Sequence, residues 1–84
     1  MLGNVLDLPS EERDLLLRTF DAWVDAGGSP QAASAALFCH PNTVRYRLHR
    51  IEACTGRTLK DPSDVAELVT AARAWAQLPH AEQN

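Results

Sequence analysis

Hydrogen-bonding and cationic side chains are concentrated in one short stretch of the chain, residues 40–51. Asn42 and Thr43 can reach base edges or phosphates, and arginine is by type a reader of phosphate and guanine. The stretch contains Arg45, Arg47 and Arg50. No other segment combines these side chains, so the sequence indicates that residues 40–51 form a DNA-recognition helix.

Charge is distributed unevenly along the chain. From His40 to Lys60 there are five Lys or Arg residues and one acid, Glu52, which gives this segment a net charge of +4. The remaining residues hold three basic and ten acidic side chains, a net charge of −7, and the whole chain carries −3. A positive segment on an acidic body is the asymmetry expected of a nucleic-acid docking face, and the acidic remainder argues against non-specific adhesion to polyanions.

The length and composition favour a small folded domain without a deep active site. A chain of 84 residues buries only about 60% of its unfolded surface, so its core is thin. A hydrophobic content of 45% with 23% charged residues fits a folded chain. No apolar run approaches the roughly 20 residues of a membrane span, and no signal sequence follows Met1. Two cysteines without framework spacing indicate a reducing, cytoplasmic setting.

Hydrophobic periodicity and helix boundary signals predict an all-α fold, a small bundle of about four helices. The helices are expected near residues 10–26, 30–37, 41–54 and 62–78. The second and third are joined by three residues, Phe38 to His40, which is typical of a helix-turn-helix. Such turns often hold a glycine where this chain has Phe38.

Capping residues mark where the predicted helices begin and end. The expected N-terminal signals are Ser10, Ser29 followed by Pro30, Pro41, and Asp61 with Asp64 in an arrangement like a capping box. The expected stops are Gly27-Gly28 and Gly56. Residues 10–79 are therefore predicted to form the helix-turn-helix domain. The apolar residues 1–9 are interpreted as a linker or strap from a preceding domain, and residues 80–84 as a flexible tail.

The predicted third helix has an apolar seam and a polar free side. At about 100° per residue, Val44, Leu48 and Ile51 share one face. The side chains expected on the free half are Asn42, Thr43, Tyr46, His49 and Arg50. Arg45 and Arg47 fall on the two flanks, where a major-groove helix meets the phosphate walls. Arg47 is expected to lay its stem on the core and extend its guanidinium outward.

With these residues in place, the chain resembles the C-terminal helix-turn-helix DNA-binding domain of PucR-type (also called CdaR-type) bacterial transcriptional regulators. The most specific part of the match is His40-x-Asn42-Thr43-Val44-x-Tyr46-Arg47-Leu48-x-Arg50-Ile51-Glu52, followed by Thr55-Gly56-Arg57-x-Leu59. Further matches are Leu16-x-x-Thr19-Phe20, Gly27-Gly28, Ala33-x-x-x-Leu37-Phe38 and Asp61-Pro62.

The resemblance implies sequence-specific binding of double-stranded operator DNA, with recognition helix 41–54 in the major groove. By position, it implies a DNA surface made of Asn42, Thr43, Arg45, Tyr46, Arg47 and Arg50. His49 is a further DNA-binding candidate from its place on the free half of the helix, although the family commonly has a basic residue at this position and the chain departs from that pattern. The resemblance also implies a homo-oligomeric regulator in the cytoplasm, whose small-molecule effector acts through domains absent from this chain.

Metal binding, catalysis, RNA binding and protein interaction are the interpretations that compete with DNA binding. Cys39, His40, His49 and Cys54 could supply four metal ligands, although zinc ligands usually come in close pairs such as C-x₂-C. No glycine-rich phosphate loop, nucleophile elbow or His-Glu-x-x-His motif is present, so neither an enzyme nor a cofactor or metal site is predicted. RNA binding would call for stacking aromatics beyond Tyr46. A helical protein-interaction or dimerisation module without direct DNA contact stays open, because Trp23 and Trp75 could serve a partner.

Overall fold

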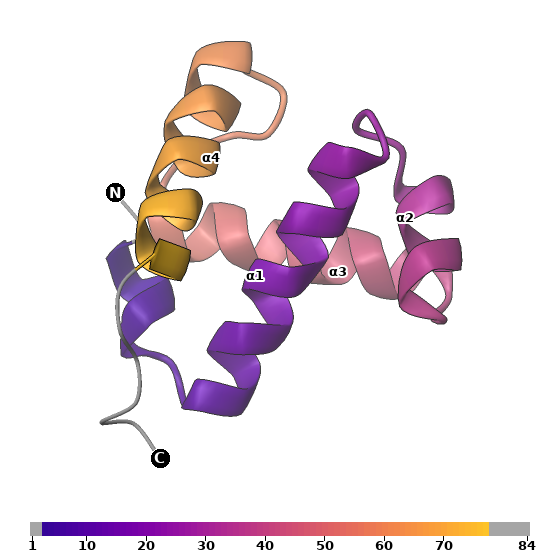
Figure 1. The fold of residues 1–84 in the computed structure, drawn as a ribbon, viewed down its shortest axis with the longest axis horizontal. Coiled ribbons are helices and arrows are strands. Elements are labelled where there is room, and N and C mark those ends of the chain that lie inside the picture. Colours follow the sequence, from indigo (N-terminus) through magenta and orange to yellow (C-terminus); the bar gives the residue numbers. More distant parts are fainter. Residues whose placement is uncertain (1–2, 78–84) are drawn as a thin grey trace.

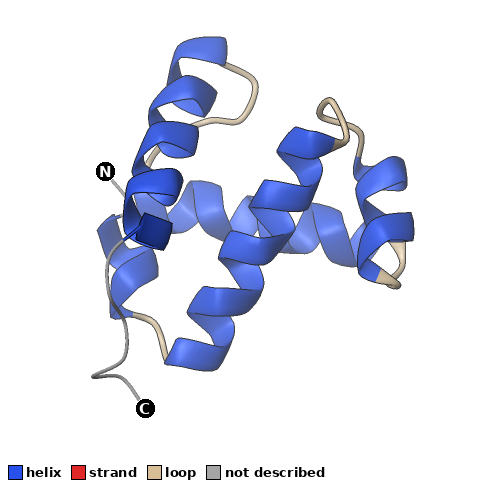
Figure 2. Ribbon diagram, in the orientation of Figure 1, coloured by secondary structure: helices blue, strands red, loops and turns tan. Residues whose placement is uncertain are grey.

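The computed structural model describes residues 3–77, and these residues form helices joined by short connections, with no strand among them (Figures 1 and 2). A 3-10 helix, η1 (Gly3–Asp7), precedes the four α-helices. These are α1 (Ser10–Asp25), α2 (Pro30–Leu37), α3 (Pro41–Thr55) and α4 (Pro62–Gln77). The predicted all-α fold is confirmed, and the predicted helix boundaries within the described residues agree to within one residue.

Helices α1, α2 and α3 pack directly on one another, and α1 crosses α3 in Figure 1. Helix α2 packs beside the N-terminal end of α3, and η1 packs against α3 and α1. Helix α4 lies on the other side of the molecule from α2 and approaches the core through side chains, among them Leu68. The exposed residues of α3 are Asn42, Arg45, Tyr46, His49 and Ala53.

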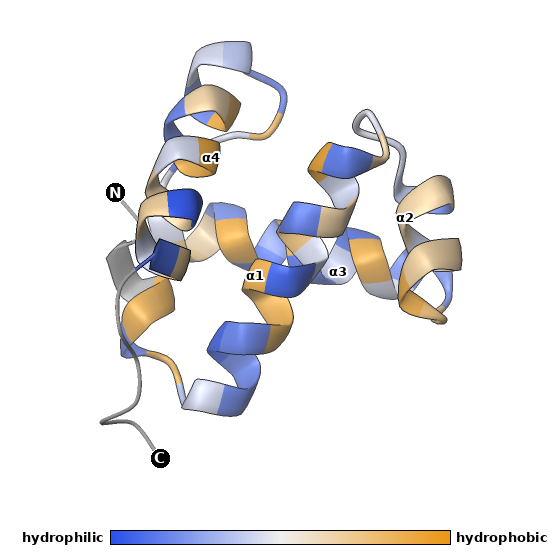
Figure 3. Cartoon of the chain, in the orientation of Figure 1, coloured by the Kyte–Doolittle hydropathy of each residue, from blue (hydrophilic) through white to orange (hydrophobic). Residues whose placement is uncertain are grey.

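The hydrophobic core lies where α1 and α3 cross, and the apolar residues of both helices meet there (Figure 3). Its buried members are Leu16, Phe20, Ala33, Val44, Leu48, Ile51 and Leu68. The predicted seam of the third helix is therefore confirmed. Ala33 is fully buried, and its small side chain lets α2 pack closely against its neighbours. The side chain of Val5 in η1 is also fully buried, so residues before α1 contribute to the fold.

Two of the predicted helix boundaries follow the expected capping chemistry. At the end of α1, Gly27 and Gly28 have φ angles of 71° and 84°, which favour glycine. The Gly27 N–H donates to the Val24 carbonyl, and the Gly28 N–H to the Trp23 carbonyl, the two bonds of a Schellman motif. At the start of α2, the Ser29 hydroxyl oxygen accepts a hydrogen bond from the Ala32 N–H at 3.1 Å.

One predicted cap was wrong, and a second, Asp61 at the start of α4, forms without the reciprocal bond expected of a capping box. Pro9, not Ser10, occupies the N-cap position of α1, because the Pro9 carbonyl already accepts the Arg13 N–H at 2.9 Å. The capping box predicted for α4 does not form at Asp64, whose carboxylate instead accepts the Thr58 N–H at 3.0 Å. Asp61 does contact the first turn of α4, since its carboxylate accepts the Ser63 N–H at 2.8 Å.

The turn between α2 and α3 begins with Phe38 in a left-handed conformation (φ 57°). A bulky residue rarely adopts this conformation, which usually selects glycine. The Phe38 side chain is 96% exposed, so no core contact compensates the backbone strain. The helix-turn-helix backbone is thus preserved at this position without its usual residue.

None of the helices among residues 3–77 combines the length and hydropathy needed to cross a membrane. The tail predicted for residues 80–84 lies outside the described residues.

Candidate nucleic-acid interface

The N-terminus of α3 is fixed by His40, which the sequence analysis did not identify as a cap. The His40 Nδ1 atom accepts the Asn42 N–H at 3.0 Å, and Pro41 occupies the first helical position. The His40 carbonyl also accepts the N–H groups of Thr43 and Val44, at 2.9 and 3.3 Å. The place of His40 directly before a proline at the first helical position could have revealed this role. The cap fixes where α3 begins and therefore the positions of Asn42 and Thr43 in its first turn.

The predicted polar side of α3 faces solvent. Asn42, Tyr46 and His49 are exposed, and Thr43 is partly exposed. Tyr46 is 64% exposed, so it is not a core aromatic. The exposed side of α3 therefore presents an amide, a phenol and an imidazole, which are all groups that can hydrogen-bond to base edges or phosphates.

One flank of α3, here called the open flank, carries Arg45, His49 and, from the following loop, Lys60. All three side chains are exposed. They help to line a shallow hollow of about 360 Å³ that also reaches Trp23 and Pro30. Arg45 donates from Nη1 to the Asn42 Oδ1 atom at 2.8 Å, within the same helix. Arg45 and Lys60 therefore place positive charge beside a shallow hollow on the open flank.

Glu52 also lines this hollow, but its carboxylate is engaged by the loop after α3. Its Oε2 atom accepts the Leu59 N–H at 2.7 Å and the Thr58 hydroxyl at 3.4 Å. These bonds hold the loop that carries Lys60 against the end of α3. The carboxylate thus supports the geometry of the open flank.

The opposite flank of α3, here called the anchored flank, carries Arg47 and Arg50 and is bound by α1. Arg47 donates from Nη1 to the Thr19 hydroxyl oxygen at 3.3 Å, and the buried Thr19 hydroxyl donates to the Leu15 carbonyl at 2.8 Å. The guanidinium of Arg47 is therefore directed toward α1. The expectation that it extends outward was wrong, because the hydroxyl of Thr19 lies within its reach.

Arg50 is held by Glu12, from the first turn of α1. The Arg50 Nε and Nη2 atoms donate to the Glu12 Oε2 atom at 3.2 and 2.8 Å. This hydrogen-bonded carboxylate, and then its negative charge, raise the pKa of Arg50 above the ordinary value of an arginine. The prediction treated α3 as an isolated helix and left Arg50 unpartnered on the free half. In the folded domain, one edge of its guanidinium is occupied by α1.

Arg57, another base of the positive segment, is paired with acids of α4. Its Nη1 atom lies 3.0 Å from Glu67 Oε1 and 3.6 Å from Asp64 Oδ1. Together with the Arg50 pair, these contacts offset part of the positive charge counted from the sequence. The remaining exposed cations of that segment are concentrated on the open flank.

The four side chains considered as metal ligands do not come together. Among residues 3–77, no three His, Cys, Asp or Glu side chains are grouped so that they could hold a metal ion. Cys39 and Cys54 are partly exposed free thiols. The described geometry gives no support to the metal interpretation.

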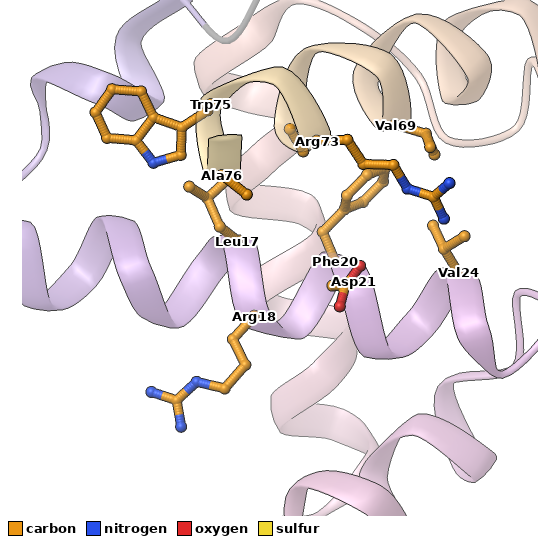
Figure 4. A pocket seen from close by; sticks show the side chains of 10 residues that line it. Leu17, Arg18, Phe20, Asp21, Val24, Val69, Arg73, Trp75 and Ala76 are labelled. Atoms are coloured by element: carbon orange, nitrogen blue, oxygen red, sulfur yellow. The ribbon is translucent and has the colours of Figure 1, made fainter. Parts of the chain in front are cut away.

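A second concave region lies between α1 and α4 (Figure 4), and its lining includes no residue of α3. It has a volume of about 240 Å³. Its apolar walls come from Leu17, Phe20 and Val24 of α1 and from Val69, Ala72, Trp75 and Ala76 of α4. The guanidinium of Arg13 stacks on the Trp75 ring at 5.2 Å, which ties the two helices together. Of the two tryptophans on which the interaction-module alternative rests, Trp75 lines this groove and Trp23 lines the hollow on the open flank.

Comparisons with known proteins agree with the helix-turn-helix geometry. A family model described as the PucR C-terminal helix-turn-helix domain matches residues 16–74. The chain is 44% identical over 54 residues to the carbohydrate diacid regulator of Escherichia coli, covering 64% of the chain and 14% of that protein. It is 33% identical over 63 residues to the purine catabolism regulatory protein of Bacillus subtilis, covering 75% of the chain and 12% of that protein.

An uncharacterised protein of Mycobacterium tuberculosis is 51% identical over 57 residues, covering 68% of this chain. The match spans only 14% of that protein's length, so the chain corresponds to a small part of its longer relatives. No solved structure shows a significant match to the chain.

Proposed function

The chain belongs to the PucR C-terminal helix-turn-helix family, and we propose that it binds double-stranded DNA sequence-specifically as the output domain of a transcriptional regulator. In this proposal α3 enters the major groove and α2 lies across it. A B-DNA major groove is wide enough for one α-helix, and the second helix of a helix-turn-helix is the one that enters it.

The observation that carries the proposal is the exposed polar side of α3. Its first turn is fixed by the His40 cap, and Asn42, Tyr46 and His49 stand exposed along its length. An asparagine side chain can bond an adenine edge through both its oxygen and its amide nitrogen. The Asn42 Oδ1 atom accepts one bond from the exposed Arg45, which leaves both amide hydrogens of Asn42 and further acceptor capacity on its oxygen for a base edge. An exposed amide at the start of a recognition helix suits base reading.

We assign different roles to the candidate residues according to their surroundings. Asn42 and Thr43, at the start of α3, are the proposed base readers, and Tyr46 and His49 extend the contact along the groove. Arg45 is the proposed phosphate contact on the open flank, because its guanidinium is exposed. Arg47 and Arg50 are proposed to meet the opposite phosphate wall while they remain bound to α1.

Selection of bound duplexes from a random pool, followed by titration of the selected duplex at several salt concentrations, tests the proposal. If the domain neutralises roughly four to six phosphates, log K should fall against log[salt] with a slope of about −4 to −5. A selected consensus with this slope is the expected result. Recovery of no consensus, together with a flat salt response, would contradict it.

We further propose that two copies act together on paired half-sites in a full-length regulator. The two named relatives are regulators of which this domain covers only 14% and 12%, so oligomerisation and effector binding are assigned to the rest of such a protein. Fusing the domain to a strong dimeriser should raise affinity for paired half-sites through effective concentration. If no half-site spacing gives a gain, the two-copy arrangement is wrong.

A further inference from the structure

The contact between Arg50 and Glu12 joins α3 to α1 across 38 residues of sequence. Both hydrogen bonds, from Nε and Nη2, end on the same carboxylate oxygen, Oε2. We propose that Glu12 is a positioning residue for DNA binding, which holds the Arg50 guanidinium so that its other edge meets a DNA acceptor. This inference rests on the proposed DNA-binding function.

The chemistry of the guanidinium supports this assignment. The group has five N–H bonds in a fixed planar fork. Glu12 takes the Nε hydrogen and one Nη2 hydrogen, which leaves the second Nη2 hydrogen and both Nη1 hydrogens for another acceptor. The remaining edge, with parallel N–H bonds on Nη1 and Nη2, matches two phosphate oxygens or the O6 and N7 atoms of guanine. Glu12 therefore occupies one edge without blocking the edge that DNA would use.

The exposure of the pair also fits a positioning role. The side chain of Arg50 is 34% exposed and that of Glu12 is 39% exposed, so the contact lies at the border between the α1–α3 packing and solvent. Arg50 follows Tyr46 by one helical turn, and Tyr46 projects from the exposed side of α3. A long side chain that is ordered before binding loses less conformational freedom when it meets DNA. Glu12 supplies that ordering from a neighbouring helix.

Two other roles for Glu12 make different predictions. If Glu12 masked Arg50 from the phosphates, removing the carboxylate charge would tighten binding, because a negative charge beside a polyanion is repulsive. If the pair only joined α1 to α3, removing it would lower stability and leave the pattern of DNA contacts unchanged. Positioning alone predicts weaker binding when a negative charge is removed. The sign of the effect therefore separates positioning from masking.

The first experiment compares Glu12→Gln with Glu11→Gln, using a duplex recovered by selection from a random pool. Glu11 is the adjacent acid in the same exposed helical turn, so its variant controls for the loss of one negative charge. Glu12→Gln should lower affinity roughly threefold to tenfold, within the range of coupling between contacting residues. Glu11→Gln should leave affinity unchanged or slightly higher. Tighter binding by Glu12→Gln would overturn the proposal.

The second experiment repeats Glu12→Gln in an Arg50→Ala background and maps phosphate contacts. If Glu12 acts through Arg50, its effect on affinity should disappear in that background. Replacing single phosphates by neutral methylphosphonates should reveal, in the wild type, a sensitive position that becomes insensitive in Arg50→Ala and less sensitive in Glu12→Gln. An unchanged pattern of sensitive positions, for phosphates and base pairs alike, would mean that the pair is only a structural link.

Thermal unfolding of each variant ensures that affinities are compared between folded proteins. Failure of this inference is distinguishable from failure of the proposed function. If the wild-type domain still selects a consensus sequence while Glu12→Gln behaves like Glu11→Gln, DNA binding stands and the positioning role falls.

Discussion

The two flanks of α3 both carry basic side chains, but the surroundings of these side chains differ. On the open flank, Arg45, His49 and Lys60 are exposed around a hollow, and Arg45 bonds only within its own helix among the described contacts. On the anchored flank, Arg47 and Arg50 are bound by side chains of α1, at 3.3 Å to Thr19 and 2.8 Å to Glu12. The charged side chains of the open flank are accessible to a ligand, whereas those of the anchored flank are held by hydrogen bonds to α1.

This difference shows that arginines on the two flanks of one helix have different surroundings. If α3 is the recognition helix, as we propose, the phosphate contacts of these arginines need not be equivalent. A cation on the open flank can adjust to the DNA, at the cost of ordering a flexible side chain. A cation on the anchored flank is already ordered but has fewer hydrogen-bond donors left. We therefore expect the open flank to contribute more to salt-dependent affinity, and the anchored flank to depend on the integrity of α1.

The buried seam of α3 lies between the two flanks, and replacing a seam residue should have the largest effect on stability. Leu48 is buried, so Leu48→Ala should lower the free energy of unfolding by about 2–5 kcal/mol. Tyr46 is exposed, so Tyr46→Ala should change it by about 0.5 kcal/mol or less while weakening DNA binding. Urea unfolding monitored by circular dichroism measures both. An equal loss of stability in the two variants would show that Tyr46 is as buried as Leu48 and does not lie on an exposed side of α3.

The side of α3 between the flanks should determine sequence preference. Asn42→Ala should cost about 1–3 kcal/mol of discrimination at one base pair, because the amide that reads the base edge is lost. Competition between the selected duplex and single base-pair variants measures this discrimination. Equal loss of affinity for scrambled duplexes would mean that Asn42 positions the helix and does not read a base.

Substituting one arginine on each flank compares the flanks directly. Arg45→Ala should reduce the salt slope by about one, with little change in stability. Arg47→Ala should lower the free energy of unfolding by about 1 kcal/mol, because it removes the hydrogen bond to Thr19. Salt titrations and urea unfolding of both variants provide the two measurements. If Arg47→Ala leaves stability unchanged and reduces the salt slope as much as Arg45→Ala, the flanks are equivalent and the comparison is wrong.

Two residues in the left-handed conformation offer a smaller test of the framework that holds the flanks. Phe38 (φ 57°) ends α2, and Gly56 (φ 71°) ends α3. Phe38→Gly should stabilise the fold by roughly 0.5 kcal/mol, since relief of strain exceeds the added entropy of the unfolded chain.

Gly56→Ala is the matched control for this substitution, because a Cβ at position 56 would meet no atom within 4 Å. It should destabilise the fold by about 1 kcal/mol through backbone strain alone. The midpoints of thermal unfolding, measured on both variants, should shift in opposite directions. A loss of stability in Phe38→Gly would show that the exposed phenylalanine makes a contact in solution.

Local patterns in the sequence were sufficient to predict most of the fold. The seam of Val44, Leu48 and Ile51 follows from helical periodicity, and the end of α1 follows from Gly27 and Gly28. Both signals act within a few residues, where propensity and capping decide the structure. Ser10 was wrongly predicted as the cap of α1, because the helix already begins with the hydrogen bond from the Arg13 N–H to the Pro9 carbonyl. Asp64 was wrongly predicted to complete a capping box, because its carboxylate accepts the Thr58 N–H.

The hydrogen-bond partners of Arg47 and Arg50 could not be predicted from such local patterns. Arg47 and Thr19 are 28 residues apart, and Arg50 and Glu12 are 38 residues apart. Their contacts depend on how α1 crosses α3, which helical periodicity does not specify. Periodicity assigned Arg50 to the uncovered half of α3, but it did not reveal that the first turn of α1 comes close enough to bind it.

Nuclear magnetic resonance of the domain, titrated with a selected duplex, tests the central claim most directly. If the exposed side of α3 binds DNA, the largest chemical-shift changes should occur at Asn42, Thr43 and Tyr46, with smaller changes along both flanks. The residues of the groove between α1 and α4 should change little. Changes confined to that groove, or no change with any duplex, would contradict DNA recognition by α3.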